Sequence, residues 1–449
     1  MRTYINDLSR LIDGPTTLAQ ARINAAVIQA AIKDGVVLHL RPGSRISVAG
    51  TLSFSGLSNA GIVWDGHGAR PYLHMPKAWF DNTSPQIGNR TANTQRALLI
   101  VVDGGPNTAC RNIRFEGIGI ASDTTGGRYV AGICAMGVRD FRMLGCDITG
   151  LPNGFGITAG SLTGDSQICA NAIHDFFDNS VVAADGRPWS RRVQSTAIEL
   201  DNNRYDPSVG VLIAENKIER IMKGRDFASL PINGGAPGKP LGMQTDGINI
   251  GHYSNDATRI VDNFIDTVDE GIDMFGSNAT IRGNRVSNAY AHGLKLIHGA
   301  QNNRISDTVI RNAGRVGIVM AGATGPDARA VSGNVATGCT VSGIGYNDVW
   351  HGNSAVAAIR FECSTPGPRT YNPTGNRVTN TTIRLTRQCQ FGWLGDAADA
   401  DLRNMGSDIR MIGTPGRERI HILPSANGHY NGAVHLAGST AYRTLLGPS

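Results

Sequence analysis

Residues 267–276 read TVDEGIDMFG and place three carboxylates, Asp269, Glu270 and Asp273, within five positions beside one glycine. Carboxylates this close repel one another, which raises the pKa of one group and leaves another ionised. A protonated and an ionised carboxyl together can act as acid and base on a glycosidic bond. The competing interpretation is a solvated polar turn before a strand, and only the neighbouring repeats can distinguish the two.

Two repeat units alternate through the middle of the 449-residue chain. The first reads apolar-x-x-Asn-x-apolar, and its copies lie at residues 168–173, 213–218, 260–265 and 281–286, with weaker copies at 305–310 and 331–336. The second reads small-apolar-x-apolar, and its copies lie at residues 132–135, 156–159, 197–200, 247–250, 271–274, 293–296 and 317–320. Several copies of the first unit follow one another after 21 to 26 residues, which suggests one turn of a coil.

Two short strands per repeat cannot close a core alone, but stacked copies can. Their apolar positions would point inward, and the recurring asparagines would form hydrogen-bonded ladders at the bends. We therefore expect an all-β fold, a parallel β-helix. The Ala-rich stretch 17–33 has apolar residues at helical spacing and is expected to cap the first coil. The expected organisation is an N-terminal segment with a capping helix, a β-helix domain, and a C-terminal cap or subunit contact, at residues 1–34, 35–390 and 391–449.

Two segments, 183–194 and 222–244, are expected to be loops inserted into the β-helix. The first carries Trp189 and Arg191. Tryptophan stacks on sugar faces and arginine binds anions, so both residues are candidates for substrate binding.

Stacked parallel strands lie about 4.8 Å apart, so equivalent positions become columns. One column contains Glu199, Asn249, Asp273 and Lys295. A second column, three residues upstream, contains Asp246, Glu270 and His292. Both columns are polar over only a few rungs, which is typical of a localised site. Strict alternation would turn the second column into the core, unless each strand begins only at its glycine, and the sequence leaves this open.

The repeat resembles that of right-handed parallel β-helix proteins, which include pectin-degrading enzymes and phage tailspikes, over roughly residues 35–385. The motif spacing resembles that of polygalacturonase-type glycoside hydrolases. QTDGI, DEGI and AHGL stand where that family has Asn-Thr-Asp, Asp-Asp and Gly-His-Gly, one rung apart. This resemblance implies that Asp269 is the general acid, that Asp246 and Glu270 position the attacking water, and that His292 supports the acid.

The sequence departs from that pattern at four places. Gln244 replaces Asn, Glu270 replaces Asp, and Ala291 replaces the first Gly. The Arg-x-Lys motif is missing, because Val319 and Ala321 occupy its positions. In the family this motif grips the uronate carboxylate, so the resemblance does not extend to a galacturonan substrate.

Composition limits the partners. The chain carries 42 Lys plus Arg against 36 Asp plus Glu, a net charge of +6, which favours a polyanion. The basic excess is not concentrated in a tail, and no nucleic-acid-binding signature appears, so a polysaccharide is expected rather than nucleic acid. No apolar run is long enough to span a membrane. Seven cysteines without CxxC spacing predict neither a zinc site nor a redox motif.

The N-terminal sequence has no basic region followed by an apolar core, so no signal peptide is visible. A polysaccharide substrate points to an extracellular protein or a phage particle, and an intracellular location stays open.

Three functions remain open. The leading one is a polysaccharide-cleaving enzyme that uses carboxylate acid/base catalysis. The second is a uronate lyase or epimerase, in which Lys295 or His292 takes the proton and Asn249, Asp273 or a Ca²⁺ ion neutralises the carboxylate. The third is a non-catalytic glycan-binding protein like a phage tailspike, with a homotrimer as one candidate assembly.

No cofactor is expected. Ca²⁺ is the one ion with a possible ligand set, Glu199 and Asp201 together with Asn249, because Ca²⁺ prefers such oxygen ligands.

Overall fold

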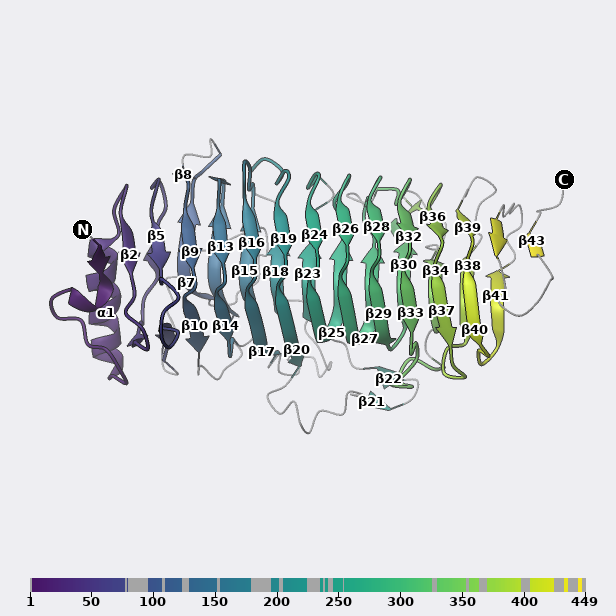
Figure 1. The fold of residues 1–449 in the computed structure, drawn as a ribbon, viewed down its shortest axis with the longest axis horizontal. Helices are drawn as coiled ribbons and strands as arrows, with labels where there is room; N and C mark the ends of the chain where they lie inside the picture. The colour runs from purple at the N-terminus through teal and green to yellow at the C-terminus, as the bar shows by residue number, and fades with distance from the viewer. Residues whose placement is uncertain are drawn as a thin grey trace. The chain divides into compact units, whose positions relative to one another are not determined.

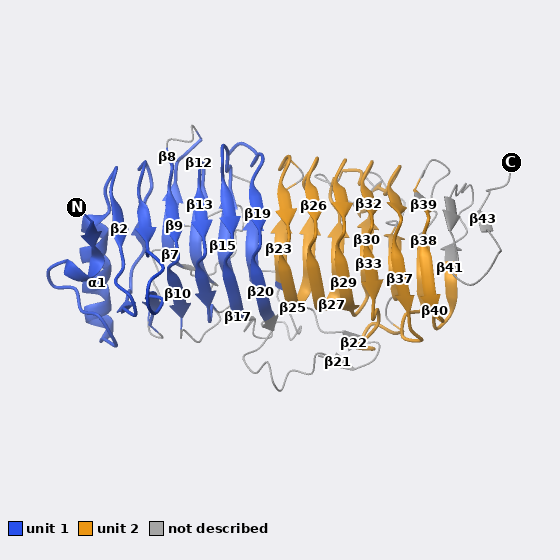
Figure 2. Ribbon diagram, in the orientation of Figure 1, with its two compact units in different colours: residues 1–227, 243–245 blue, residues 228–242, 246–449 orange. Residues whose placement is uncertain are grey.

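The computed structural model describes most of the chain. The described residues are 2–76, 79, 96–106, 110–122, 129–151, 154–178, 195–201, 205–223, 235–236, 239–240, 245–252, 254–324, 329–352, 355–362, 370–396, 404–423, 432–434 and 443–445. The chain divides into two compact units (Figure 2). Unit 1 contains Met1–Phe227 and Met243–Thr245, and unit 2 contains Ala228–Gly242 and Asp246–Ser449.

Unit 1 is built from three stacks of parallel strands (Figure 1). The first stack contains β1 (Thr3–Tyr4), β2 (Val37–His39), β5 (Gly61–Val63), β9 (Arg114–Glu116), β13 (Arg142–Leu144), β16 (Gln167–Cys169) and β19 (Leu212–Ala214). The second contains β3 (Arg45–Ser47), β6 (Tyr72–Met75), β10 (Gly119–Ser122), β14 (Asp147–Thr149), β17 (Ala172–Asp178) and β20 (Lys217–Lys223). The third contains β4 (Leu52–Ser53), β7 (Arg96–Asp103), β11 (Tyr129–Met136), β15 (Phe155–Gly160) and β18 (Ser195–Leu200). A 3-10 turn at Ile5–Asp7 and the short pair β8 (Cys110–Arg111) and β12 (Val138–Arg139) complete the unit.

Unit 2 repeats the same plan. Its first stack contains β24 (Arg259–Val261), β26 (Thr280–Arg282), β28 (Arg304–Ser306), β32 (Val335–Thr337), β36 (Arg377–Thr379) and β39 (Met405–Ser407). Its second contains the first parts of β25 (Phe264–Met274) and β27 (Arg285–Leu296), then β29 (Val309–Ala313), β33 (Thr340–Ser342), β37 (Thr382–Leu385) and β40 (Arg410–Gly413). Its third contains β23 (Thr245–Ile250), the second parts of β25 and β27, β30 (Val316–Ala321), β34 (Ala357–Glu362), β38 (Phe391–Asp396) and β41 (Glu418–Leu423). Three short antiparallel pairs flank them, namely β21 (Gly235–Ala236) with β22 (Lys239–Pro240), β31 (Ala323–Thr324) with β35 (Thr370–Tyr371), and β42 (Gly432–Val434) with β43 (Arg443–Leu445).

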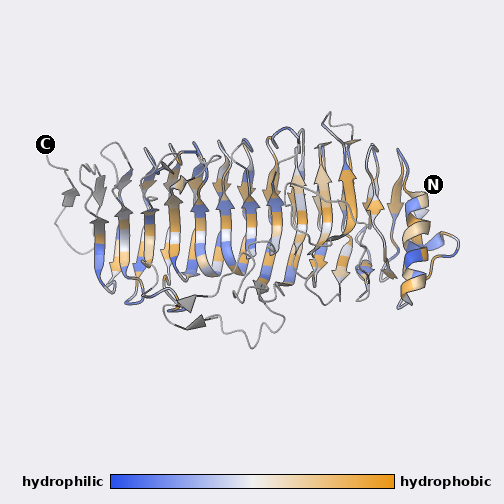
Figure 3. Ribbon diagram, turned by 180° about the vertical axis from the view of Figure 1, so that it is seen from behind, coloured by the Kyte–Doolittle hydropathy of each residue, from blue (hydrophilic) through white to orange (hydrophobic). Residues whose placement is uncertain are grey.

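Alternation along each short strand creates the core. In the first stack of unit 2, the middle residue of successive strands is buried at Ile260, Ile281, Ile305, Ala336 and Val378. The flanking residues point outward, and Figure 3 shows the resulting bands of hydrophilic and hydrophobic residues along the strands. The predicted parallel β-helix architecture is confirmed.

The predicted capping helix is also present, as α1 (Leu18–Ala31). Thr17 begins it as the N-cap, and its side chain accepts a hydrogen bond from the Gln20 N–H. Buried Asn24 donates from Nδ2 to the carbonyl oxygen of Ser47 at 2.9 Å, and the Ala49 N–H donates to Ala21 at 3.0 Å. The helix therefore shields the apolar end of the first coil, as a terminal cap must.

Asparagine ladders are present as predicted, and the described residues of unit 2 contain two of them. Asn263 donates from its backbone N–H and from Nδ2 to Oδ1 of Asn284. Asn334 does not continue that ladder, although the repeat alignment placed it there. It lies at the bend before its strand, in a separate ladder of unit 2 that contains Asn303, Asn334, Asn376 and Asn404. In both ladders a buried apolar residue lies two positions after the asparagine, as Val286 follows Asn284 and Ala336 follows Asn334, so the sequence pattern alone does not separate the two bends.

The parallel pairing extends past residue 390, where a C-terminal cap was expected to begin. Phe391 pairs with Ala357 and with Glu418, so rungs continue to Leu423. The six described cysteines are free thiols. No helix in the described part of the chain is long and apolar enough to cross a membrane.

Candidate active site

The strand register of unit 2 matches both predicted columns. Asp246 pairs with Glu270 and Glu270 with His292. Asn249 pairs with Asp273 and Asp273 with Lys295. The third stack of unit 2 therefore gathers seven of the predicted site residues on three successive strands, β23, β25 and β27, because Asp269 also lies on β25.

Glu270 faces the same side as Asp273, which the sequence left open. Lys295 Nζ contacts Oε2 of Glu270 at 2.9 Å and Oδ2 of Asp273 at 3.3 Å, so both carboxylates point to one lysine. The register between β25 and β27 shifts at Val268–Glu270, which bends the strand and breaks strict alternation.

A glycine at the bend is required for this arrangement. A Cβ at Gly271 would lie 2.4 Å from Val286 Cγ1 and 2.4 Å from the Gly293 carbonyl oxygen, so this position faces the core. Ile272, the next residue, is also fully buried. Two successive inward positions free the residues on either side, Glu270 and Asp273, to point outward together. This accounts for the small residue that opens each small-apolar-x-apolar unit.

His292 links Glu270 to an arginine. Its Nδ1 lies 2.8 Å from Oε1 of Glu270, and its Nε2 lies 3.3 Å from Nη1 of Arg315. A guanidinium can only donate, so Nε2 must accept and Nδ1 must carry the hydrogen that is given to Glu270. Burial lowers the pKa of His292, and the hydrogen bond with Glu270 only partly opposes this, so the ring is neutral near pH 7.

The carboxyl groups are held in different states. Burial, followed by the charges of Glu270 and Asp246, raises the pKa of Asp269 well above its usual range. Burial would raise the pKa of Glu270 too, but Lys295 and the hydrogen bond from His292 outweigh it and lower that pKa. The pKa values of two adjacent carboxyl groups are thus shifted in opposite directions, the division that acid/base catalysis requires.

Asp273 and Asn249 offer unused polar atoms. Oδ1 of each is buried without a hydrogen-bond partner, and Nδ2 of Asn249 donates to Oδ2 of Asp246 at 3.1 Å. Burial raises the pKa of Asp273 although Lys295 opposes it. Buried polar atoms without partners are rare in folded proteins, so these two oxygens are candidates for contacting a ligand.

Sequence reasoning missed the outer part of the cluster. Arg315 Nη2 donates to Glu362 at 2.9 and 3.2 Å, and its guanidinium lies over the ring of Trp350, 5.7 Å from the centroid. Arg360 lies in the column of Lys295, two rungs further along, and its guanidinium is 3.6 Å from Glu362. A signal for Arg360 existed, because residues 358–361 read AIRF and fit the second repeat unit. Trp350 and Arg315 lie outside the strand pattern and carried no such signal.

The structure does not show the remaining predicted residues as part of this cluster. Glu199 lies in unit 1, where its carboxylate accepts a hydrogen bond from Thr158 at 2.8 Å. Trp189 and Arg191 lie outside the described residues, as does most of the 222–244 segment. Within the described ranges, no group of three or more His, Cys, Asp or Glu is arranged to hold a metal ion, so the Ca²⁺ site stays a prediction without geometric support.

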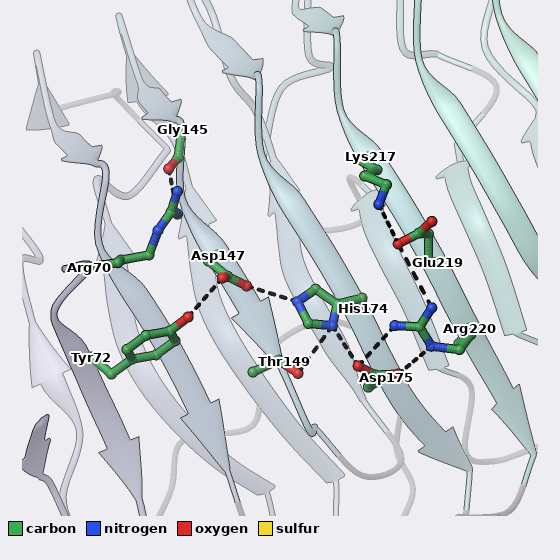
Figure 4. A network of polar contacts seen from close by, with 10 residues as sticks. All are labelled: Arg70, Tyr72, Gly145, Asp147, Thr149, His174, Asp175, Lys217, Glu219 and Arg220. Atoms are coloured by element: carbon green, nitrogen blue, oxygen red, sulfur yellow. Dashed lines mark hydrogen bonds and ion pairs between the residues drawn. The ribbon is translucent and has the colours of Figure 1, made fainter. Parts of the chain in front are cut away.

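Unit 1 carries a separate polar network along its second stack (Figure 4). His174 contacts Oδ1 of Asp147 at 3.0 Å and Oδ2 of Asp175 at 2.6 Å. Tyr72 donates to Asp147 at 2.8 Å, and Arg220 pairs with Asp175. The hydrogen bonds that His174 donates to Asp147 and Asp175 raise the pKa of His174 to about 9. The acids drawn in this network have basic partners, and Arg70 donates to the Gly145 carbonyl oxygen, which fits a structural role.

The chain is similar to a known protein family over part of its length and to solved structures in its fold. A family described as "Periplasmic copper-binding protein (NosD)" matches residues 232–398, less than half of the chain. No curated protein matches. The fold is similar to that of the Dettilon tailspike protein, with 14% identity, a TM-score of 0.52, and coverage of 94% of this chain and 68% of that one. The chain is a right-handed parallel β-helix.

The chain is also similar to two other solved structures. A double mutant of the tailspike protein of E. coli bacteriophage HK620, solved with a pentasaccharide, is 11% identical, with a TM-score of 0.51. The match covers 96% of this chain and 65% of the tailspike, so this β-helix spans about two thirds of that protein's length. A polygalacturonase from Erwinia carotovora ssp. carotovora is 12% identical, with a TM-score of 0.45 and coverage of 94% and 95%.

Proposed function

We propose that this β-helix is a carbohydrate-active enzyme that cleaves a polysaccharide by acid/base hydrolysis. The observation that carries the proposal is the adjacent pair Asp269 and Glu270, one carboxyl with a raised pKa and one with a lowered pKa. Hydrolysis of a glycosidic bond needs a proton donor for the leaving oxygen and an ionised group for the opposite side. The tailspike solved with a pentasaccharide shares the fold, which is consistent with a glycan ligand.

Each residue of the cluster has a role in this proposal. Asp269 is the general acid in this proposal, because burial and the neighbouring carboxylates raise its pKa well above its usual range. Glu270 activates or positions the water, and His292 and Lys295 keep it ionised. Asp273 and Asn249 bind substrate hydroxyls through their unused Oδ1 atoms.

The lyase alternative finds less support. Burial would lower the pKa of Lys295, but Asp273 and Glu270 outweigh it and raise that pKa, so the lysine stays protonated and is a poor base. His292 is neutral, but both ring nitrogens are engaged, one by Glu270 and one by Arg315. Neither group is therefore free to take a proton from a sugar carbon.

The copper site that the NosD description suggests is not proposed either, because the described residues contain no group of three or more His, Cys, Asp or Glu that could hold a metal ion.

The proposal is tested with a panel of neutral and acidic polysaccharides, assayed for new reducing ends and for ultraviolet absorbance of unsaturated products. Hydrolysis predicts reducing ends without the absorbance. Reducing ends accompanied by the absorbance would instead establish elimination. Binding without turnover of any panel member would support a non-catalytic glycan-binding protein.

The residue roles are tested with Asp269→Asn and Glu270→Gln, each expected to lower kcat by about 10²–10⁴-fold, the usual contribution of a positioned acid or base. Asp307→Asn is the matched control, because Asp307 is exposed and its backbone φ of 51° suits asparagine. Melting curves establish that each variant is folded. Full activity in folded Asp269→Asn would remove the general acid from this mechanism.

A further inference from the structure

Unit 2 carries exposed arginines on the outside of its first two stacks. They occupy the first or third position of the short strands, and alternation turns these positions outward. The eight residues, termed the arginine face, are Arg259, Arg282, Arg285, Arg304, Arg311, Arg377, Arg384 and Arg410. These stacks are distinct from the third stack, which holds the candidate active site.

The arginine face lacks matching carboxylates. None of the salt bridges found among the described residues involves any of the eight arginines. Asp266 is the one acid at an outward strand position of these described strands, and Asn288 already binds it at 2.6 Å. The flanking bends add four carboxylates, Asp256, Asp262, Asp307 and Asp408. Eight arginines against five acids leave a positive surface.

Unit 1 shows that the fold does not impose this pattern. The corresponding strands of its second stack carry Asp147, His174, Lys217 and Glu219 (Figure 4). Lys217 pairs with Glu219 at 2.8 Å, and His174 lies between two carboxylates. The same positions therefore carry balanced charge in one unit and unbalanced arginine in the other, which indicates a function for the latter.

The spacing of the charges limits the partner. In the paired strands Arg304 is followed two rungs later by Arg377, and Arg311 by Arg384. Two rungs correspond to about 9.6 Å. Duplex DNA presents one charge per about 1.7 Å of its axis, a far denser array. Single-stranded nucleic acid is bound by stacking aromatic residues, and Phe264 is the one aromatic residue at an outward position on the described strands of these two stacks.

Most of the other outward positions on these strands carry hydroxyl groups. Outward strand positions carry Thr280, Ser287, Ser306, Thr337, Thr340, Ser342, Thr379, Thr382 and Ser407. Guanidinium groups bind carboxylates and sulfates with two parallel hydrogen bonds, and hydroxyls can pair with sugar hydroxyls. We propose that the arginine face binds an acidic polysaccharide, separately from the candidate active site.

The test measures binding of dextran, carboxymethyl dextran and dextran sulfate, which share one backbone, with duplex DNA and anionic lipid vesicles as further arms. The expected result is binding of both anionic dextrans, weakened by salt, and no binding of dextran. Equal binding of neutral dextran would overturn the proposal, as would tighter binding of DNA or vesicles at the same salt concentration.

The assignment to this face is tested with the triple variant Arg282→Gln, Arg285→Gln and Arg304→Gln. We expect about tenfold weaker binding of the anionic dextrans and a shallower salt dependence, since each exposed ion pair contributes modestly. The matched control replaces three exposed unit 1 arginines, Arg45, Arg111 and Arg139, by Gln and should bind normally. An equal loss in the control would overturn the assignment. Because polysaccharide turnover is measured separately, this outcome is independent of whether the acid/base cluster is catalytic.

Discussion

At the scale of single residues, the candidate site depends on how one histidine is oriented. His292 can hold Glu270 ionised only if its hydrogen is on Nδ1, and the donor at Nε2 that enforces this is Arg315. Glu362 binds the same arginine, and Trp350 lies beside it, so the guanidinium is fixed on two sides. Arg315 is therefore a positioning residue for the proposed chemistry.

Replacing Arg315 by Met should release this constraint. We expect ¹⁵N NMR of His292 to show a mixture of tautomers where the wild type shows hydrogen on Nδ1, and kcat on a cleaved polysaccharide to fall about tenfold with a shifted acidic limb of the pH profile. Arg315→Lys keeps a donor and should recover part of both signals. Wild-type His292 with its hydrogen on Nε2 would contradict the assignment.

At the scale of elements, the pairing of neighbouring strands decides which charged side chains contact one another. In unit 1, β14, β17 and β20 bring His174 between Asp147 and Asp175, with Thr149 at 3.4 Å and Arg220 on the far side of Asp175. The two carboxylates favour the imidazolium and raise the pKa of His174 to about 9. The contact of His174 with these two carboxylates should make the free energy of unfolding depend on pH.

The direction of this pH dependence follows from the raised pKa of His174. Stabilisation by His174 is fully present below its ordinary pKa of about 6.5 and is lost as pH rises through about 9. The difference in unfolding free energy between wild type and His174→Gln should be larger at about pH 6 than at about pH 10 by roughly 1–3 kcal/mol, after screening at a side chain that is 26% exposed. Denaturant titrations of wild type and His174→Gln at both pH values measure this difference in unfolding free energy. The exposed His67→Gln variant should show no such change, and a pH-independent difference at His174 would contradict the prediction.

At the scale of the whole molecule, stability is a sum of rungs and their neighbours, as in other solenoids. Asn334 donates to Ala300 at 2.9 Å and to Asn376 at 2.8 Å, and it accepts from Asn303. Removing it leaves buried backbone groups without partners, which costs about 1–3 kcal/mol.

Asn334→Ala should therefore loosen its own region first. Hydrogen exchange is expected to accelerate in β28, β32 and β36 while α1 and β2 in unit 1 keep their protection. Thr337→Ala, a half-buried outward position on the same strand, is the control and should change little. Uniform acceleration in both units would show that the chain unfolds as one cooperative body instead.

The sequence by itself determined the parallel β-helix, the capping helix and the register of the polar columns, because these depend on local periodicity that repeats at a regular interval. Asp246, Glu270 and His292 could be aligned from spacing alone. The repeat pattern did not predict which ladder Asn334 joins, since the two bends of a rung have similar sequences.

Only the tertiary structure decided which way Glu270 points, because the bend at Gly271 breaks the alternation from which sequence reasoning infers direction. It also brought Arg315 and Trp350 to His292, which no spacing within the repeat anticipates. The charge states of Asp269 and Glu270 likewise depend on burial and on neighbours from adjacent rungs. Local pattern fixes which residues stack, whereas the protonation of a buried carboxyl is set by the complete three-dimensional surroundings.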